Sequence, residues 1–564
     1  MKKSFAIICA LLSLAACNKV TPIEENPTQK ESGQEFKVNL TFSRSNISED
    51  TKASVKTSFA SGDVVFIFFN GVGDSTNPKY LEMKYNGSTW VPTQKNDLGA
   101  SDLSGAGTKE LTAIYLPYGS GYEVAYDGGF TIKDDSGNDY SGHFYAHHVG
   151  YTFTSNTLGA DVNLSAVTSV GDKLVHFDVT DFVDGHTYAM YQEYIKPISL
   201  SSISADGIVN KNVGSKGDAI QGYQDASFIS FSGVLDNTVV GSPVDYWFSI
   251  RDTFDGTLYY RDAGSQTISA NKYIGLGSFA SKWSVATPGV FTASASGERI
   301  TFARSNLSYR GATGGGKPWQ LMKYPWSVIE TTSPFNRTSS VDFSLFGWAT
   351  SGYNSKYPWF NSNQPVDYGP AISSGEFAPS WDWGQYNKGN IYEYGGDVAL
   401  SGNWRVLSQP EWLYILGVTS TETNCGRNET NRFARCVVGG LYGVAIFPDD
   451  FDFPSGFPTV QEINKYTSGK SATVAFEQNT FTSIQWNMLE AMGVAFLPCA
   501  GQGNPSSDST YAGLTNYNTA VRIWTSTASN SEQAYGILIG NASANALKTN
   551  NRHMAASVRL VRDL

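Results

Sequence analysis

Charged residues, histidines and cysteines are all scarce in this chain. Only 16% of its 564 residues are Asp, Glu, Lys or Arg, and the net charge is -11. Lysine and arginine form no run that would bind a phosphate backbone, so nucleic acid is not predicted as a partner. A Gly-x-Ser-x-Gly segment is missing, and only one of the 6 histidines lies beyond His186, which argues against nucleophilic catalysis.

The apolar run at the N-terminus, residues 5–12, is too short to span a bilayer. It follows two lysines and precedes small residues, which is the pattern of a signal peptide. The segment Leu14-Ala15-Ala16-Cys17 resembles the lipobox of bacterial lipoproteins. That resemblance implies that Cys17 is acylated and becomes the mature N-terminus after residues 1–16 are removed.

Residues 18–35 are predicted to form a flexible tether, because they hold too few apolar side chains to fold. By resemblance to other bacterial lipoproteins, Asn18 after the acylated cysteine implies transfer to the outer membrane. Glu24 and Glu25 resemble the acidic export signals of Bacteroides lipoproteins. We therefore expect a surface-exposed outer-membrane protein that contacts the membrane through its lipid anchor only.

Three cysteines remain once Cys9 and Cys17 are set aside. Cys425 and Cys436 flank a short turn-like segment and could form a disulfide in an oxidising compartment. Spacing alone does not fix their separation, so the pairing is left open. Cys499 has apolar neighbours and is expected to be a small buried residue.

Glycine and aromatic residues are abundant, and they favour short strands and turns over long helices. The chain has 56 glycines, and 13% of its residues are aromatic. Apolar runs such as 64–69, 111–116 and 228–231 are separated by Gly, Asn, Asp and Ser clusters, without helical periodicity. We predict a mainly β chain that begins with two antiparallel β-sandwich domains, 36–170 and 171–285.

Three short motifs in this region occur in an order that resembles the fimbrillin-like proteins of Bacteroidales. The motifs are Thr51-Lys52-Ala53-Ser54, Phe59-Ala60-Ser61-Gly62-Asp63-Val64 and Tyr85-Asn86-Gly87-Ser88-Thr89-Trp90. Phe59 stands where a tryptophan would be expected in that family. The resemblance implies paired β-sandwiches that serve as pilus subunits or tip proteins. Other pilus subunits would then be partners, bound by strand addition at a sheet edge.

Two helices are predicted beyond residue 285, and each begins with a capping box. Ser408 and Glu411 can each accept a hydrogen bond from the other's backbone N–H group, and Thr482 and Gln485 repeat the arrangement. Glycines at 417 and 493 should end the two helices. The side chains expected to point inward are Trp412, Ile415, Leu416, Trp486, Leu489 and Met492.

Residues 286–564 carry a series of motifs that resembles the C-type-lectin-like domains of Bacteroides surface proteins. The series includes Leu345-Phe346-Gly347-Trp348, Trp381-Asp382-Trp383-Gly384, Trp404-Arg405-Val406-Leu407, Phe496-Leu497-Pro498, Trp524-Thr525-Ser526 and Ser557-Val558-Arg559-Leu560. These domains are distant relatives of the formylglycine-generating fold, and some are receptors diversified by retroelements. The resemblance implies an α+β domain whose last strand lies beside its first, with an exposed binding face. Formylglycine-generating activity is not carried over, because the expected reactive cysteine pair is absent.

The last fifty residues contain the predicted binding face. Alternation should turn Trp524, Ile537 and Ile539 inward and leave Gly536, Leu538 and Gly540 outward. Resemblance to the variable receptors places ten residues on the ligand-binding face: Arg522, Ile523, Ser529, Asn530, Glu532, Gln533, Gly536, Leu538, His553 and Ala556. The alternative is an ordinary solvated edge, because polar loops cover any fold.

No metal site or other cofactor is predicted. His143 and His147 would share one face of a strand and His148 the other, but zinc requires three or four ligands. The aspartates of residues 449–452 could gather around calcium, yet they lack the spacing of an EF-hand. Residues 311–318 approach a phosphate-binding loop, but a proline stands where its Ser or Thr should be.

These patterns favour a lipid-anchored surface adhesin or a pilus-tip-like protein over an enzyme. The expected ligand is a protein or a glycan on another cell or host. The alternative is an extracytoplasmic enzyme, either a glycan hydrolase or a formylglycine-type enzyme, housed in residues 286–564.

Overall fold

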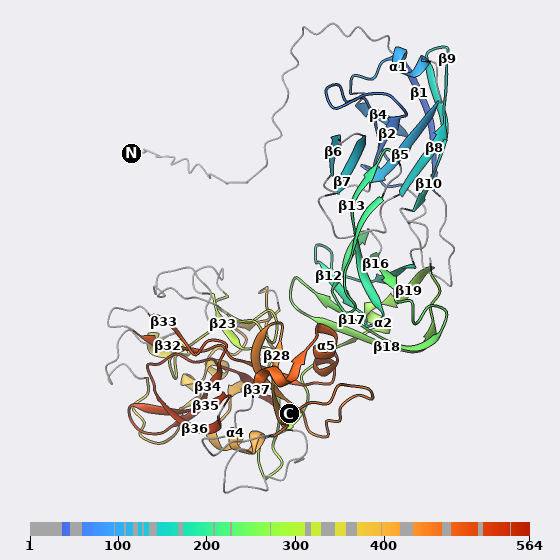
Figure 1. The fold of residues 1–564 in the computed structure, drawn as a ribbon. Coiled ribbons are helices and arrows are strands. Elements are labelled where there is room, and N and C mark those ends of the chain that lie inside the picture. Colours follow the sequence, from blue (N-terminus) through green and yellow to red (C-terminus); the bar gives the residue numbers. More distant parts are fainter. Residues whose placement is uncertain are drawn as a thin grey trace, which may run out of the picture.

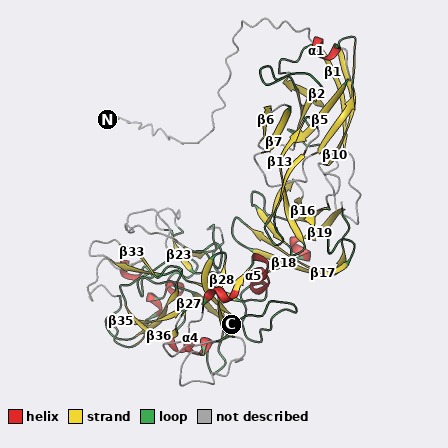
Figure 2. Cartoon of the chain, viewed as in Figure 1, coloured by secondary structure: helices red, strands yellow, loops and turns green. Residues whose placement is uncertain are grey.

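The computed structural model describes residues 36–44, 59–94, 96–105, 109–116, 122–126, 129–134, 144–166, 173–206, 209–225, 228–270, 272–310, 317–328, 344–356, 369–395, 398–417, 432–464, 475–505, 511–541 and 543–564. The predictions for the signal peptide, Cys17, the tether, residues 51–54, His143, residues 311–316 and Cys425 lie outside these ranges. Strands dominate throughout, which confirms the mainly β prediction (Figure 2). Figure 1 shows three bodies along a bent molecule. We call residues 36–166 the first body, 173–285 the middle body and 286–564 the head.

An eight-stranded sheet forms most of the first body. Its order is β1-β10-β8-β5-β2-β3-β4, with β9 paired to β10. Runs such as β2 are buried on both faces, since one face packs in the body's own core and the other meets a second sheet. The elements are β1 (Lys37–Arg44), β2 (Val64–Phe69), β3 (Leu81–Tyr85), β4 (Trp90–Gln94), α1 (Ala100–Ser104), β5 (Glu110–Leu116), β8 (Phe144–Gly150), β9 (Thr152–Thr154) and β10 (Thr157–Ala166).

A twelve-stranded sheet runs across the predicted domain boundary at residue 170. The long strand β13 pairs with β16 at one end and with β7 at the other, so the first and middle bodies share it. Its elements are β6 (Tyr122–Tyr126), β7 (Phe130–Asp134), β11 (Leu174–Thr180), β12 (Tyr188–Tyr191), β13 (Ile195–Ser204), β14 (Val209–Val213), β15 (Ile220–Asp225), β16 (Phe228–Leu235), β17 (Pro243–Asp252), β18 (Leu258–Thr267), β19 (Lys272–Ser278), α2 (Phe279–Lys282) and β20 (Ser284–Val285).

The head contains several small sheets and the longest helices. Its last strand lies between β22, near the start of the head, and β27, and pairs antiparallel with both. The strands are β21 (Phe291–Thr292), β22 (Arg299–Phe302), β23 (Leu307–Tyr309), β24 (Trp319–Leu321), β25 (Gly375–Glu376), β26 (Ile391–Tyr392), β27 (Trp404–Val406), β28 (Phe433–Val438), β29 (Leu441–Ile446), β30 (Thr480–Phe481), β31 (Ala495–Pro498), β32 (Gln502–Pro505), β33 (Tyr511–Thr515), β34 (Ala520–Ala528), β35 (Gln533–Gly540), β36 (Ser543–Asn551) and β37 (Leu560–Asp563). The α-helices are α3 (Trp383–Tyr386), α4 (Gln409–Leu416) and α5 (Ser483–Ala491).

Both predicted capping boxes are present. The Ser408 side chain accepts from the backbone of Glu411 at the start of α4, and Thr482 accepts from Gln485 at α5. Five of the six side chains expected to point inward are buried, but Met492 is 40% exposed. The prediction for Met492 was wrong because α5 ends at residue 491, and Met492 is the C-cap beyond the last helical turn.

A buried ion pair joins the middle body to the head. Arg251 at the end of β17 donates to Asn487 Oδ1 at 2.6 Å and to Glu490 Oε2 at 2.8 Å, both on α5. Its guanidinium carbon also lies 5.0 Å from the centre of the Trp326 ring. The turn after β17 continues the contact, since a Cβ on Gly256 would lie 2.1 Å from the Lys323 carbonyl oxygen. Glycine is therefore required at this close approach between the bodies.

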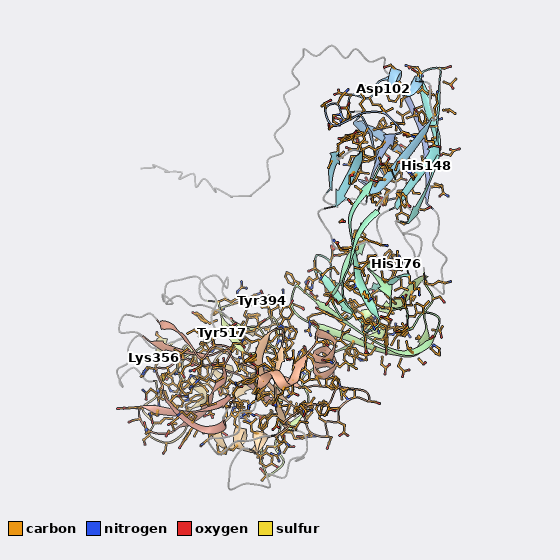
Figure 3. All side chains as sticks on the ribbon, in the orientation of Figure 1. Asp102, His148, His176, Lys356, Tyr394 and Tyr517 are labelled. Atoms are coloured by element: carbon orange, nitrogen blue, oxygen red, sulfur yellow. The ribbon has the colours of Figure 1, made fainter. Side chains whose placement is uncertain are left out.

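His176 should make the stability of the chain depend on pH. It lies in β11 (Figure 3), is 2% exposed, and holds Nδ1 2.9 Å from Ser232 Oγ. Burial lowers the pKa of His176 from 6.5 to about 4. Between these pH values the unfolded chain binds a proton that the folded chain does not, so stability falls as pH falls and levels off below pH 4. When the free energy of unfolding is measured with urea between pH 6.5 and 4, it should fall less steeply with pH in His176→Gln than in the unsubstituted chain. Equal slopes for the two proteins would contradict the assignment.

Candidate functional site

The predicted binding face belongs to the sheet β25-β34-β35-β36. Arg522 lies opposite Leu538 and Trp524 opposite Gly536, so these four residues share one face of the β34–β35 hairpin. The other face carries Val521, Ile523, Ile537 and Ile539. Ile537 and Ile539 are buried as predicted, and so is Trp524, but Trp524 packs on the opposite side of the sheet.

Three of the ten predicted ligand contacts are buried. Ile523 is 1% exposed, Ala556 is 3% exposed, and Gly536 is also buried. Ile523 packs into the core cluster on one face of β34, and Ala556 into the cluster on the other. Gly536 is covered by Trp524, whose Cε3 would lie 3.6 Å from a Cβ at that position. These three residues therefore cannot touch a ligand at the surface, contrary to the prediction.

The other seven predicted residues keep some exposed surface, and we call them the hairpin face. They are Arg522, Ser529, Asn530, Glu532, Gln533, Leu538 and His553. Asn530 and Glu532 are the most exposed, at the tip between β34 and β35. Asn530 Oδ1 accepts from the backbone N–H groups of Glu532 and Gln533, both at 2.8 Å, so the tip is a closed turn.

Arg552 is 0% exposed and supports this tip from the interior of the head. Its guanidinium donates to the Asn530 carbonyl and, at 3.3 Å, to that of Gln533. It also donates to the Pro370 carbonyl at 2.9 Å and lies 4.4 Å from the centre of the Trp348 ring. No sequence pattern predicted this role, because every acceptor is a backbone carbonyl. The result is an exposed turn with a rigid support.

Arg522 gives the hairpin face an available cation. Burial lowers the pKa of Arg522, and Nη1 donates to Asn550 Oδ1 at a long 3.4 Å. Its buried Nε has no hydrogen-bond partner, and none of the described carboxylates forms an ion pair with it. A ligand with a carboxylate, sulfate or hydroxyl acceptor could bind the part of the guanidinium that remains exposed, although not the buried Nε.

Of the aspartates of residues 449–452, Asp449 has a structural role. Asp449 Oδ2 accepts from the Thr292 backbone and hydroxyl, at 2.7 and 2.6 Å, and so fixes the start of the head. Within the described ranges, one trio of metal-ligand types has donor atoms within 4.8 Å: His186, Asp252 and Asp255. Asp252 bonds His186 and the Phe254 N–H, so the trio already serves a turn.

The two described cysteines of the head are buried. Cys436 lies in β28 and Cys499 just after β31, and neither forms a disulfide in the structure. Burial raises the pKa of each thiol, so both act as small apolar residues, as expected for Cys499. Because Cys425 lies outside the described residues, its pairing with Cys436 stays a prediction.

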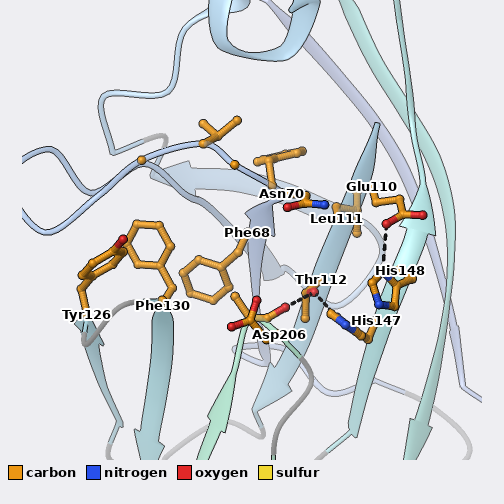
Figure 4. A pocket seen from close by; sticks show the side chains of 16 residues that line it. Phe68, Asn70, Glu110, Leu111, Thr112, Tyr126, Phe130, His147, His148 and Asp206 are labelled. Atoms are coloured by element: carbon orange, nitrogen blue, oxygen red, sulfur yellow. Dashed lines mark hydrogen bonds and ion pairs between the residues drawn. The ribbon is translucent and has the colours of Figure 1, made fainter. Parts of the chain in front are cut away.

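A pocket of about 350 Å³ lies mainly in the first body, and Ala205 and Asp206, which follow β13, complete its lining (Figure 4). A β-bulge shapes one side of it: His147 and His148 of β8 both lie opposite Thr112 of β5. His148 has φ 55°, and the two rings come within 3.8 Å, so both histidines line the pocket instead of facing opposite ways as predicted.

The bulge also determines the protonation of His147. The Thr112 hydroxyl donates its only proton to the Ala205 carbonyl, and its oxygen lies 2.6 Å from His147 Nδ1. His147 must therefore donate from Nδ1, which leaves Nε2 as an acceptor. Burial, together with the neighbouring His148, lowers the pKa of His147, so the ring is neutral at pH 7.

Comparison with known proteins finds only distant structural similarity. No family model matches the chain, and no curated protein matches it. A fimbrial protein from Bacteroides ovatus aligns over 94% of this chain and 99% of its own, at 12% identity and a TM-score of 0.19. Candidate cell adhesion proteins from Bacteroides fragilis and Bacteroides uniformis align over 43% and 44% of this chain and 91% and 96% of their own, at 11% and 12% identity, each with a TM-score of 0.20. Such low scores carry no argument about fold or function.

The described helices were also compared with the requirements of a membrane span. None of them combines the length and the apolar character needed to cross a bilayer.

Proposed function

We propose that this chain is a lipid-anchored, surface-exposed outer-membrane protein that binds a protein or glycan ligand through the hairpin face of its head. Acylated Cys17 would supply the anchor, and the first and middle bodies would hold the head away from the membrane. Other pilus subunits are proposed partners of those two bodies, whose eight-stranded sheet ends in β1 and β4.

The support of the hairpin tip by buried Arg552 is the observation that carries this proposal. A solvated edge that only covers the fold has no need of a buried guanidinium bonded to four backbone carbonyls. Binding surfaces gain affinity from such order, because a rigid loop loses less conformational entropy when it meets its ligand. Arg552 bonds only backbone carbonyls, so it does not occupy the exposed side chains of the tip, which stay available for a ligand.

Substitution of exposed Glu532 and half-buried Leu538 on the hairpin face should weaken binding and leave the chain folded. We expect Glu532→Arg combined with Leu538→Asp to weaken capture of the ligand found on glycan and protein arrays at least tenfold. The free energy of unfolding should change by about 0.5 kcal/mol or less per exposed position. Glu298→Arg, on the exposed β21–β22 hairpin of the same head, is the matched control and should bind normally. Unchanged binding by the double variant would refute the hairpin face.

A further inference from the structure

The pocket of the first body has an aromatic side. Phe68 stacks on Phe130 with ring centres 5.0 Å apart and planes 19° from parallel. Tyr126 meets Phe130 edge to face at 5.1 Å. Phe68 and Phe130 are 1% and 5% exposed, so the core fixes their orientation. Tyr126 is only partly buried, so its ring is the one of the three that a bound cation can meet, and aromatic rings attract cations.

Two carboxylates, Glu110 and Asp206, line the same pocket. Figure 4 shows the rings on one side, Glu110 with the two histidines on the other, and Asp206 between. None of the sixteen lining residues is lysine or arginine. Glu110 Oε2 lies 2.8 Å from His148 Nδ1, and Asp206 Oδ2 would lie 3.2 Å from a Cβ at Gly129. The contact with His148 therefore positions Glu110, while Asp206 is exposed beside Gly129.

His147 adds an acceptor to this negatively charged pocket. Its Nε2 carries a lone pair, because Nδ1 donates to Thr112. Rings, carboxylates and an imidazole acceptor together match the needs of a guanidinium or an ammonium group, which offers several N–H donors and a flat or compact charge.

We propose that this pocket binds the cationic side chain, arginine or lysine, of another protein. A volume of about 350 Å³ accommodates such a side chain. A metal ion is disfavoured, because the only preformed trio of ligand types in the described ranges lies in the middle body, not here. The site lies in a different body from the hairpin face and is independent of it, so the chain would engage two partners.

Paired probes that differ only in charge test the proposal. The full chain is titrated with Nα-acetyl-arginine amide and with its neutral isostere Nα-acetyl-citrulline amide, using ligand-detected NMR. We expect the arginine probe to bind about tenfold more tightly, and less so as salt is raised. Glu110→Gln combined with Asp206→Asn keeps the shape of the pocket and should remove this preference without changing the melting temperature.

Glu82→Gln is the matched control, because it removes a carboxylate from β3 of the same sheet but outside the pocket. It should keep the preference for arginine. Equal binding of the two probes, no binding of the arginine probe, or a preference that survives the double substitution would overturn the proposal. Stoichiometric Zn²⁺ binding that is lost in His147→Ala would also overturn it, by showing a metal site.

Discussion

Arg251→Ala is expected to destabilise the chain by about 3 to 5 kcal/mol, because it leaves a carboxylate buried without its cation. Arg251 and Glu490 are 2% and 6% exposed, and Glu490 also accepts from Trp486 Nε1 at 3.0 Å. Water could solvate the unpaired Glu490 carboxylate only if the head separated from the middle body. Urea unfolding followed by tryptophan fluorescence suits the measurement, since ten of the 13 tryptophans lie at residue 319 or beyond.

A double-substitution cycle separates the ion pair from simple loss of packing. Arg251→Ala and Glu490→Ala together should cost less than the sum of the two single changes, because the second removes the charge that the first left unpaired. Arg299→Ala, at an exposed position of β22, is the control and should change stability by about 0.5 kcal/mol or less. Strict additivity, or a mild effect of Arg251→Ala, would show that water solvates the joint.

Local patterns in the sequence predicted local structure well. The apolar runs at 64–69, 111–116 and 228–231 all form strands, and both capping boxes begin helices. In each case the determining interactions lie within a few residues along the chain. The shared sheet was not predicted, because the pairing of β13 with β7 joins segments about seventy residues apart, whose register leaves no local pattern.

The candidate sites depended on features that sequence patterns do not carry. One extra residue at the β8 bulge turned His148 toward the same pocket as His147. The period-two prediction for the last fifty residues assumed that one face of the hairpin meets solvent. Both faces of β34 are instead covered, one by the cluster that includes Ile523 and the other by the cluster around Trp524. Alternation identifies which side chains share a face, but not how many faces are buried.

Trp524→Ala tests this two-sided core and should destabilise the head by about 3 to 5 kcal/mol. Trp524 is 0% exposed, and its Nε1 donates to the Phe346 carbonyl at 2.7 Å. Its backbone N–H also donates to Ser557 at 3.0 Å, which ties β34 to the chain before the last strand. Removal of the indole would therefore leave a large cavity beneath the hairpin face and remove one of the two hydrogen bonds to the Phe346 carbonyl, which also accepts from the Ala556 N–H group. The measurement is the midpoint of urea unfolding.

Two further variants serve as controls for Trp524→Ala. Trp524→Phe keeps most of the ring but not the N–H group, so it should cost about 0.5 to 1.5 kcal/mol, the usual net contribution of one hydrogen bond, because the Phe346 carbonyl still accepts from the Ala556 N–H group. Trp381→Ala, at a half-buried position of the same head, should cost less than Trp524→Ala. If Trp524→Ala were as mild as Trp381→Ala, the face of the sheet that carries Trp524 would be open to solvent.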